Sequence, residues 1–193
     1  MTPSIILAST SVYRAQALAQ FDIPFTSADP KVQERRISGE SARAQSQRLA
    51  CEKATAVAKT NPYAIVIGAD QVGECKGKLL HKPLSVANAI KGLCEISGKQ
   101  ATFYSALAVY CPKRQKLFKK VVPTRLVFRT ISRQQAKDYV QKDRPLDCAG
   151  GFKIESLGIA LFEQVSAKDP SALIGLPLIA LTTMLNDCGV QLV

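Results

Sequence analysis

The segment SIILASTSVYRAQAL, residues 4–18, places three consecutive hydroxyl side chains and then an arginine after an apolar run. Ile5 to Ala8 is typical of a buried strand, and a helical pattern begins after the hydroxyl residues. The first turn of a helix offers free backbone N–H groups and the positive end of the helix dipole, which favour an anion. Ser9, Ser11 and Arg14 would add two hydroxyls and a planar cation, so this junction indicates a phosphate site. The alternative is that Ser11 only caps the helix and Arg14 lies in solvent.

Two acidic residues are candidates for holding a cation or orienting a water molecule. Asp70 ends the apolar run AIVIGAD, and Glu34 lies in the loop segment KVQERR. In α/β proteins ligands gather at the carboxyl ends of strands, which is where we expect Asp70. The alternatives are an aspartate that only begins a turn and a glutamate that forms a surface ion pair of little energetic value.

Two lysines are candidates for neutralising a phosphate oxygen as point charges. Lys53 lies close to the apolar face of a predicted long helix, and Lys82 lies in HKP between a predicted strand and a predicted helix. Each could instead be a surface lysine that extends its charge into water along apolar neighbours. From composition alone, the surface-lysine interpretation is favoured for both.

Strands and helices that alternate along the chain must position these candidates. Apolar runs predict strands over residues 5–8, 25–28, 64–70, 102–111, 116–129, 148–155 and 158–167. Helical spacing predicts helices around residues 15–21, from about 41 to 60, from the cap Ser85 to Gly98, from the Ser132 capping box through Val140, and over 175–185 with Pro177 near its start. The pattern indicates an α/β domain whose mixed β-sheet is flanked by helices.

Length and composition bound the class of protein. The 193 residues suit a single domain over 1–193, and a hydrophobic content of 47% argues for an ordered globule. No apolar stretch reaches the roughly 20 residues of a membrane helix, and no secretion leader is recognised, so we expect no membrane partner and a cytoplasmic location. The six scattered cysteines and the single histidine argue against a Cys/His zinc site and for reduced, mostly buried thiols.

The formal net charge of +11 raises the question of a polyanionic partner. Lysine and arginine are scattered, with local concentrations only at residues 31–48 and 113–120. This distribution favours a solvated basic face and argues against nucleic acid as a partner. The sharper interpretation is attraction of a small, highly anionic ligand such as a nucleotide.

Several motifs in a fixed order carry a resemblance to a known family over nearly the whole chain. They are LASTSVYR, RLACEKA, VIGADQV, HKPLS, YVQKDRPLDCAGGFKIE, GIALFE and LIGLPL. Together they resemble the Maf family of nucleoside triphosphate pyrophosphatases. The resemblance implies an elongated mixed β-sheet flanked by helices, related to the inosine triphosphate pyrophosphatases. It also implies that a divalent metal cation, Mg²⁺ or Mn²⁺, assists hydrolysis of the α,β-phosphoanhydride of a nucleoside triphosphate to the monophosphate and pyrophosphate, and it is compatible with a homodimer.

The same resemblance implies a role for each candidate. Asp70 corresponds to the family's proton acceptor, and with Glu34 it would hold the metal. The positions that match the family's phosphate-binding residues are Ser9, Ser11, Arg14, Lys53 and Lys82. The chain departs from the family pattern at Gln33, where a second acid is common, and at His81, where glycine is common.

Three further positions are associated in this family with the choice of base, and here they are Tyr13, Gln71 and Glu155. The combination is similar to the branch that acts on 7-methyl-GTP, and the branch that acts on dTTP and UTP is the alternative. A methylated guanine ring is cationic, so Tyr13 could stack on it, and Glu155 could accept from the guanine N1–H and amine. Without the family, core packing is the preferred explanation of Tyr13, and a solvated strand end is that of Glu155. The alternative from another class is a nucleic-acid-binding regulator of cell division, which the positive charge suggests.

Overall fold

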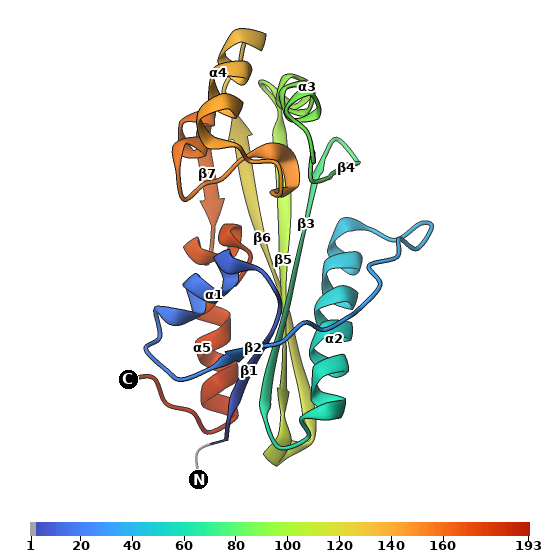
Figure 1. Cartoon of the computed structure of the whole chain (residues 1–193), viewed down its shortest axis with the longest axis vertical. Coiled ribbons are helices and arrows are strands. Elements are labelled where there is room, and N and C mark those ends of the chain that lie inside the picture. The colour runs from blue at the N-terminus through green and yellow to red at the C-terminus, as the bar shows by residue number, and fades with distance from the viewer. Residues whose placement is uncertain (1–2) are drawn as a thin grey trace. The chain divides into compact units, whose positions relative to one another are not determined.

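The computed structural model describes residues 3–193, which form a mixed seven-stranded sheet and five α-helices (Figure 1). The strands are β1 (Ile5–Ala8), β2 (Thr26–Ser27), β3 (Ile65–Cys75), β4 (Lys78–Leu80), β5 (Gln100–Cys111), β6 (Lys116–Phe128) and β7 (Phe162–Ala167). The helices are α1 (Val12–Ala19), α2 (Ala42–Thr60), α3 (Val86–Ile96), α4 (Arg133–Asp143) and α5 (Leu178–Asp187). Short 3₁₀ turns are η1 (Pro112–Arg114), η2 (Ala149–Gly151), η3 (Leu157–Leu161) and η4 (Pro170–Ile174). Within these residues no helix has the length and apolar character needed to cross a membrane.

The sheet confirms the predicted mixed α/β class. Its strand order is β2-β1-β3-β5-β6-β7, with β4 paired to β3. Strand β1 is parallel to both β2 and β3, whereas β4 and β7 are antiparallel to β3 and β6. In the β1–β3 register Ala8 lies opposite Gly68, so the hydroxyl residues that follow β1 begin beside the middle of β3.

The described residues divide into two compact units. The first unit comprises the chain up to Gln71, residues 104–122 and the chain from Asp169 onward; the second comprises residues 72–103 and 123–168. Strands β3, β5 and β6 each contribute residues to both units. The single domain expected over residues 1–193 stays a prediction.

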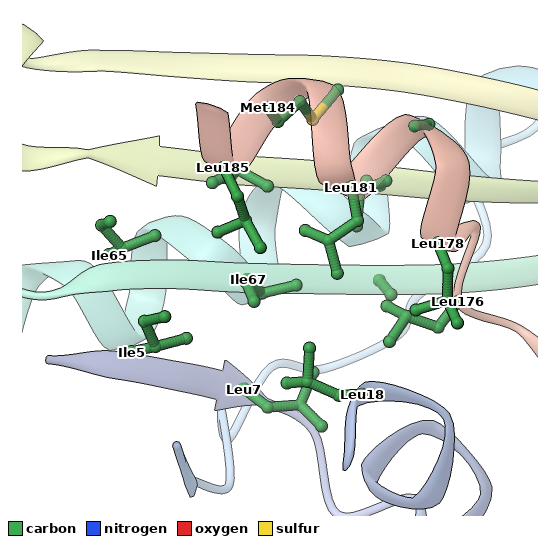
Figure 2. Close-up of a cluster of buried hydrophobic side chains, with 14 of the residues drawn as sticks. Ile5, Leu7, Leu18, Ile65, Ile67, Leu176, Leu178, Leu181, Met184 and Leu185 are labelled. Carbon is green, nitrogen blue, oxygen red and sulfur yellow. The ribbon is translucent and has the colours of Figure 1, made fainter. Parts of the chain in front are cut away.

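The first unit buries apolar side chains on both faces of its strands. Because successive side chains of a strand point to opposite faces, Ile5 and Ile67 pack on one face with residues of α1 and α5. Figure 2 shows Leu181 and Leu185 of α5 directed at this face. Ile6 and Val66 lie on the other face, where side chains of α2 cover them.

Gly68 allows α2 to approach the sheet closely. A Cβ atom at this position would lie 2.3 Å from the carbonyl oxygen of Ala50 and 2.6 Å from the backbone nitrogen of Ala54. Both neighbours are backbone atoms of a helix and cannot move aside alone. The glycine therefore sets the distance between α2 and β3, and with it the position of every side chain that α2 directs at that strand.

The second unit has an aromatic core. Phe103, Phe128, Phe152 and Phe162 form a chain of ring contacts with centroids 4.7 to 5.7 Å apart. Three of the four contacts are edge-to-face, a packing that stabilises beyond the area that the rings bury. Gly73 leaves room for this cluster, since a Cβ there would lie 2.6 Å from the ring of Phe103.

The structure corrects three predictions of secondary structure. The strand predicted over residues 148–155 is wrong, because Gly150 and Gly151 adopt positive φ angles of 79° and 70° and form the turn η2. The strand predicted over 158–167 begins only at Phe162, after the turn η3. Strand β3 runs on to Cys75, so Asp70 lies inside a strand and not at its end as we expected. The predicted caps Ser85 and Ser132 are confirmed, the second with the full capping box.

Candidate functional site

The centre of the candidate site is a lysine held between two carboxylates. Lys53 Nζ lies 2.6 Å from Asp70 Oδ1 and 2.5 Å from Glu34 Oε1. The side chains of Lys53 and Asp70 are each 8% exposed, whereas that of Glu34 is 56% exposed. The cluster therefore extends from the buried face of the sheet toward solvent.

Three local features bring these residues together. Asp70 lies on the same face of β3 as Val66 and Gly68, which is the face that α2 covers. Lys53 is on α2, directly before Ala54. The backbone of Ala54 packs closely against Gly68 of β3, which brings Lys53 near that strand. The predicted alternative of a surface lysine is thus wrong for Lys53, because its ammonium is buried and paired.

Arg48 ties the loop that carries Glu34 to α2. Its guanidinium contacts Glu40 at 2.7 Å and Glu52 at 3.2 Å, and Nη2 also donates to the backbone carbonyl of Arg35 at 3.0 Å. An arginine fork with several acceptors holds an otherwise exposed segment more firmly than a single surface ion pair would. Glu34 is the residue next to this anchor.

The hydroxyl junction after β1 places Arg14 in the same cluster. Arg14 Nε donates to the carbonyl of Gly175 at 3.1 Å, and Nη1 donates to Ser9 Oγ at 3.4 Å. Ser11 Oγ accepts from the backbone nitrogen of Arg14 at 3.4 Å, so Ser11 caps α1, as one of the two interpretations predicted. Arg14 is not a solvated surface arginine, because its guanidinium donates hydrogen bonds to both Gly175 and Ser9.

The charges of the cluster act on one another. Burial raises the pKa of Asp70, while the ammonium of Lys53 and then the guanidinium of Arg14 oppose that shift. Burial also lowers the pKa of Arg14, and the charges of Asp70 and Glu34 oppose this. Asp70 is thus a carboxylate whose proton affinity is raised by its surroundings, as is typical of a general base.

A pocket of about 370 Å³ lies beside this junction. Its lining residues are Ser9, Thr10, Ser11, Val12, Ala15, Gln16, Ala19 and Ser27. The volume is within the range of small-ligand pockets. Of the predicted phosphate-binding residues it contains the two serines, and the charged groups lie outside its lining.

Gln71 points to the opposite face of β3 from Asp70. Its Nε2 lies 2.9 Å from Ser105 Oγ, 3.1 Å from the carbonyl of Ala172 and 3.0 Å from that of Leu173. The last two belong to η4, the turn that precedes Gly175. Gln71 therefore contacts the segment that binds Arg14.

Lys82 and Glu155 lie in the second unit, and both are exposed. Two backbone hydrogen bonds tie the loop of Lys82 to the turn before Glu155: Leu84 N donates to the carbonyl of Leu146 at 3.0 Å, and Gly150 N to that of His81 at 3.1 Å. His81, at the position where glycine is common in the family, is exposed, so its larger side chain lies in solvent.

The segment that carries Glu155 is anchored to α4 on both sides of that residue. The backbone nitrogen of Lys153 donates to the hydroxyl of Tyr139 at 3.0 Å, and Ser156 Oγ donates to the carboxylate of Asp143 at 2.8 Å. Burial raises the pKa of Tyr139, so its hydroxyl stays neutral. Glu155 is thus exposed on a loop that is anchored on both sides, and the alternative of a solvated strand end is wrong.

Three residues of the site were missed from the sequence: Ser105, Asp169 and Gly175. Ser105 is a lone hydroxyl in the apolar strand ATFYSALAVY, and Asp169 precedes Pro170 as a helix cap often does. Either signal could have drawn attention to the residue, yet neither reveals its partner. Tyr13 lies half-buried in the first turn of α1.

Donors for a metal are few among residues 3–193, where no group of three or more histidine, cysteine, aspartate or glutamate side chains could hold an ion. The carboxylates of Glu34 and Asp70 both contact the ammonium of Lys53. Mg²⁺ is commonly held by one or two carboxylates together with substrate phosphates and water, so the donor set fits a metal that arrives with a nucleotide.

Comparison with known proteins defines the family. A sequence model of the Maf-like proteins matches residues 4–188, and the chain belongs to this family. It is 44% identical over 189 residues to the 7-methyl-GTP pyrophosphatase of Nitrosospira multiformis, a match that covers 98% of this chain and 96% of the relative. The proteins of the same name from Aromatoleum aromaticum and Pseudomonas aeruginosa are 45% and 41% identical, over 97% and 98% of this chain and 97% and 99% of theirs.

Among solved structures, the Ham1 protein of Staphylococcus aureus is similar over 67% of this chain and 72% of that chain, with a TM-score of 0.46 and 18% identity.

Proposed function

We propose that this protein is a nucleoside triphosphate pyrophosphatase whose substrate is 7-methyl-GTP. It would hydrolyse the α,β-phosphoanhydride and release 7-methyl-GMP and pyrophosphate. The observation that carries the proposal is the buried Lys53–Asp70 pair beside Arg14, in a chain whose relatives at 40 to 45% identity are named 7-methyl-GTP pyrophosphatases.

Asp70 accepts the proton of the attacking water in this mechanism. Its environment suits the task, because burial raises its pKa while the charge of Lys53 opposes that rise. A general base works best when its pKa approaches the working pH and it still carries its charge.

The fixed cations and hydroxyls bind the triphosphate. Arg14 offers the remaining donors of its guanidinium, and Ser9 and Ser11 lie beside it. Lys53 and Lys82 add point charges. Phosphoryl-group chemistry depends mainly on positioning and on neutralising charge on the phosphate oxygens, so this set of donors matches the demand.

A divalent cation, Mg²⁺ or Mn²⁺, would be held by Glu34 and Asp70. When bound, it supplies charge neutralisation for the phosphate oxygens and the leaving pyrophosphate. Lys53 already lies between the two carboxylates and keeps them together before the metal arrives.

Tyr13 and Glu155 select the base by contact in this proposal, whereas Gln71 acts through the turn η4, which its amide holds. The methylated guanine carries positive charge, so stacking on Tyr13 gains a cation–π contribution of about 0.5–2 kcal/mol. Glu155 accepts from the two adjacent donors of guanine, whereas uracil and thymine offer only one. The exposed and anchored position of Glu155 supports this role.

The protein acts in the cytoplasm in this proposal, and its six cysteines, all unpaired, suit a reducing compartment. Three of them, Cys75, Cys111 and Cys188, are buried and the others are half-buried. The expected homodimer stays a prediction, which sedimentation velocity would test.

Pyrophosphate release from a panel of 7-methyl-GTP, GTP, UTP and dTTP tests the proposal. We expect the highest kcat/KM for 7-methyl-GTP, loss of activity with a chelator and recovery with Mg²⁺ or Mn²⁺. Glu155→Gln should lower kcat/KM for 7-methyl-GTP about tenfold more than for UTP, the loss typical of a charged hydrogen-bond acceptor. Glu163→Gln, at an exposed glutamate of β7 in the same unit, is the matched control. Preference for UTP or dTTP, or cleavage of no triphosphate, would refute the assignment.

A further inference from the structure

Ser105 is a fully buried serine in the middle of the apolar strand β5. Its hydroxyl donates to the carbonyl of Ala172 at 2.5 Å and accepts from Gln71 Nε2 at 2.9 Å. Since Leu107 and Val109 pack on the face of the sheet that α5 covers, alternation places Ser105 on that same face. A buried hydroxyl in such a strand needs partners, and here both are polar groups of the first unit.

The amide nitrogen of Gln71 has no hydrogen left for a ligand. Its two hydrogens face three acceptors within 3.1 Å, namely Ser105 Oγ and the carbonyls of Ala172 and Leu173. The two carbonyls also determine which end of the amide faces inward, because a carbonyl can only accept. Gln71 and Ser105 therefore clamp the turn η4 from the side of the sheet.

Asp169 holds the same turn from its other end. It caps η4 by accepting from the backbone nitrogen of Ser171 at 3.1 Å, and its second oxygen accepts from Ile179 N at 2.8 Å. The turn then ends at Gly175, whose φ of 101° is a conformation that other residues rarely adopt.

Gly175 connects this turn to Arg14 by a hydrogen bond. Its carbonyl accepts from Arg14 Nε at 3.1 Å, and a Cβ atom at Gly175 would lie 3.2 Å from that nitrogen. The position of the guanidinium is thus determined by a carbonyl whose turn is clamped by Ser105, Gln71 and Asp169.

We infer that Ser105 is a positioning residue for triphosphate binding: through Gln71 and the turn η4 it holds the Gly175 carbonyl that orients Arg14. The inference rests on the proposed function, because it assigns Arg14 to the substrate phosphates. Ser105 itself touches no substrate. Its removal frees the Arg14 fork to rotate, and the substrate must then order that fork on binding.

The direct test is hydrogen exchange of the Arg14 Nε–H, measured by NMR on the full-length ¹⁵N-labelled protein without substrate. The resonance is assigned by its loss in Arg14→Lys, since lysine has no such group. Ser105→Ala should speed this exchange about 3- to 10-fold, the change expected for loss of one or two buried hydrogen bonds. Ser105→Cys keeps the shape with a weaker donor and should give an intermediate rate; it also serves if the alanine variant does not fold.

Ser46→Ala is the matched control. Ser46 is also fully buried, but its hydroxyl donates to the carbonyl of Arg43 within its own helix, the one partner it has among residues 3–193. We expect it to leave the Arg14 exchange rate unchanged. In assays with 7-methyl-GTP, Ser105→Ala should raise KM by about the same 3- to 10-fold with kcat nearly unchanged, since the base Asp70 is untouched.

Unchanged Arg14 exchange in both Ser105 variants, or an equal change in Ser46→Ala, would overturn the inference. Faster exchange without a rise in KM would also overturn it, because Arg14 would then be mobile without consequence for the substrate. If the wild-type protein cleaved no triphosphate, the proposed function would fail, and the exchange rates would still decide whether Ser105 positions Arg14.

Discussion

Asp70 and Asp169 are both buried aspartates of the first unit, at 5% and 3% exposure, yet their surroundings differ in kind. Asp169 accepts from backbone nitrogens of Ser171, Ile179 and Ala180 and from the hydroxyl of Ser171, so fixed donors satisfy both of its oxygens. Asp70 contacts the end of a long lysine side chain, and burial raises its pKa.

The difference teaches what each buried charge contributes. The backbone N–H groups of η4 and α5 converge on Asp169 only in the folded chain, so this side chain holds the two elements together. The raised pKa of Asp70 makes proton uptake easier, which a structural carboxylate does not need. We assign stability to Asp169 and chemistry to Asp70, and the following predictions test that division in order of decreasing effect.

Asp70→Asn should have the largest effect, on turnover. The amide cannot accept a proton from water, so we expect kcat for 7-methyl-GTP to fall by about 10²- to 10⁴-fold. The free energy of unfolding at pH 7 should stay equal or rise. The pKa of Asp70 is raised in the folded state, so its contribution to stability is present below its unfolded pKa. That contribution is lost as the pH rises through the folded pKa. Asparagine does not ionise, so the variant does not lose stability in this way at pH 7.

Steady-state kinetics and urea unfolding at pH 7 measure both quantities for this variant. Near-normal kcat would remove Asp70 from the mechanism, and a large drop in stability would make it a structural residue like Asp169.

Asp169→Ala should show the opposite pattern. It leaves buried backbone donors of η4 and α5 without partners, so we expect the free energy of unfolding to fall by about 2–4 kcal/mol. Urea denaturation followed by circular dichroism gives the value, with Asp187→Ala near the end of α5 as the control. An unchanged stability would contradict the structural role.

Lys53→Met should have the smallest effect of the three and concerns pH. Lys53 is the main group that lowers the pKa of Asp70 against burial, so its loss raises that pKa further. The base is active when ionised, so the acidic limb of the profile of kcat/KM against pH should move to higher pH, by about one unit. Lys82→Met, at an exposed lysine of the second unit, should leave that limb in place. An equal shift of the acidic limb in both variants would contradict the specific effect of Lys53 on the pKa of Asp70.

Much of the fold follows from local pattern. The strands predicted from the apolar runs of β1 and β3, the caps Ser85 and Ser132 and the mixed class are all confirmed by the structure. The predicted strand over residues 148–155 failed because adjacent glycines at positive φ override an apolar composition. The family prediction is confirmed over residues 4–188. The individual site roles, the metal and the homodimer stay predictions.

The amino-acid sequence by itself determined which side chains could do chemistry: a hydroxyl junction with Arg14, the acids Glu34 and Asp70, and the two lysines. Residue type and local spacing carry that information. Only the tertiary structure decided that Lys53 bridges Glu34 and Asp70, and that Arg14 is bound by the carbonyl of Gly175. These contacts join segments far apart in the chain, and they depend on how closely helices pack on the sheet. Gly68 sets one such distance, which no local pattern encodes.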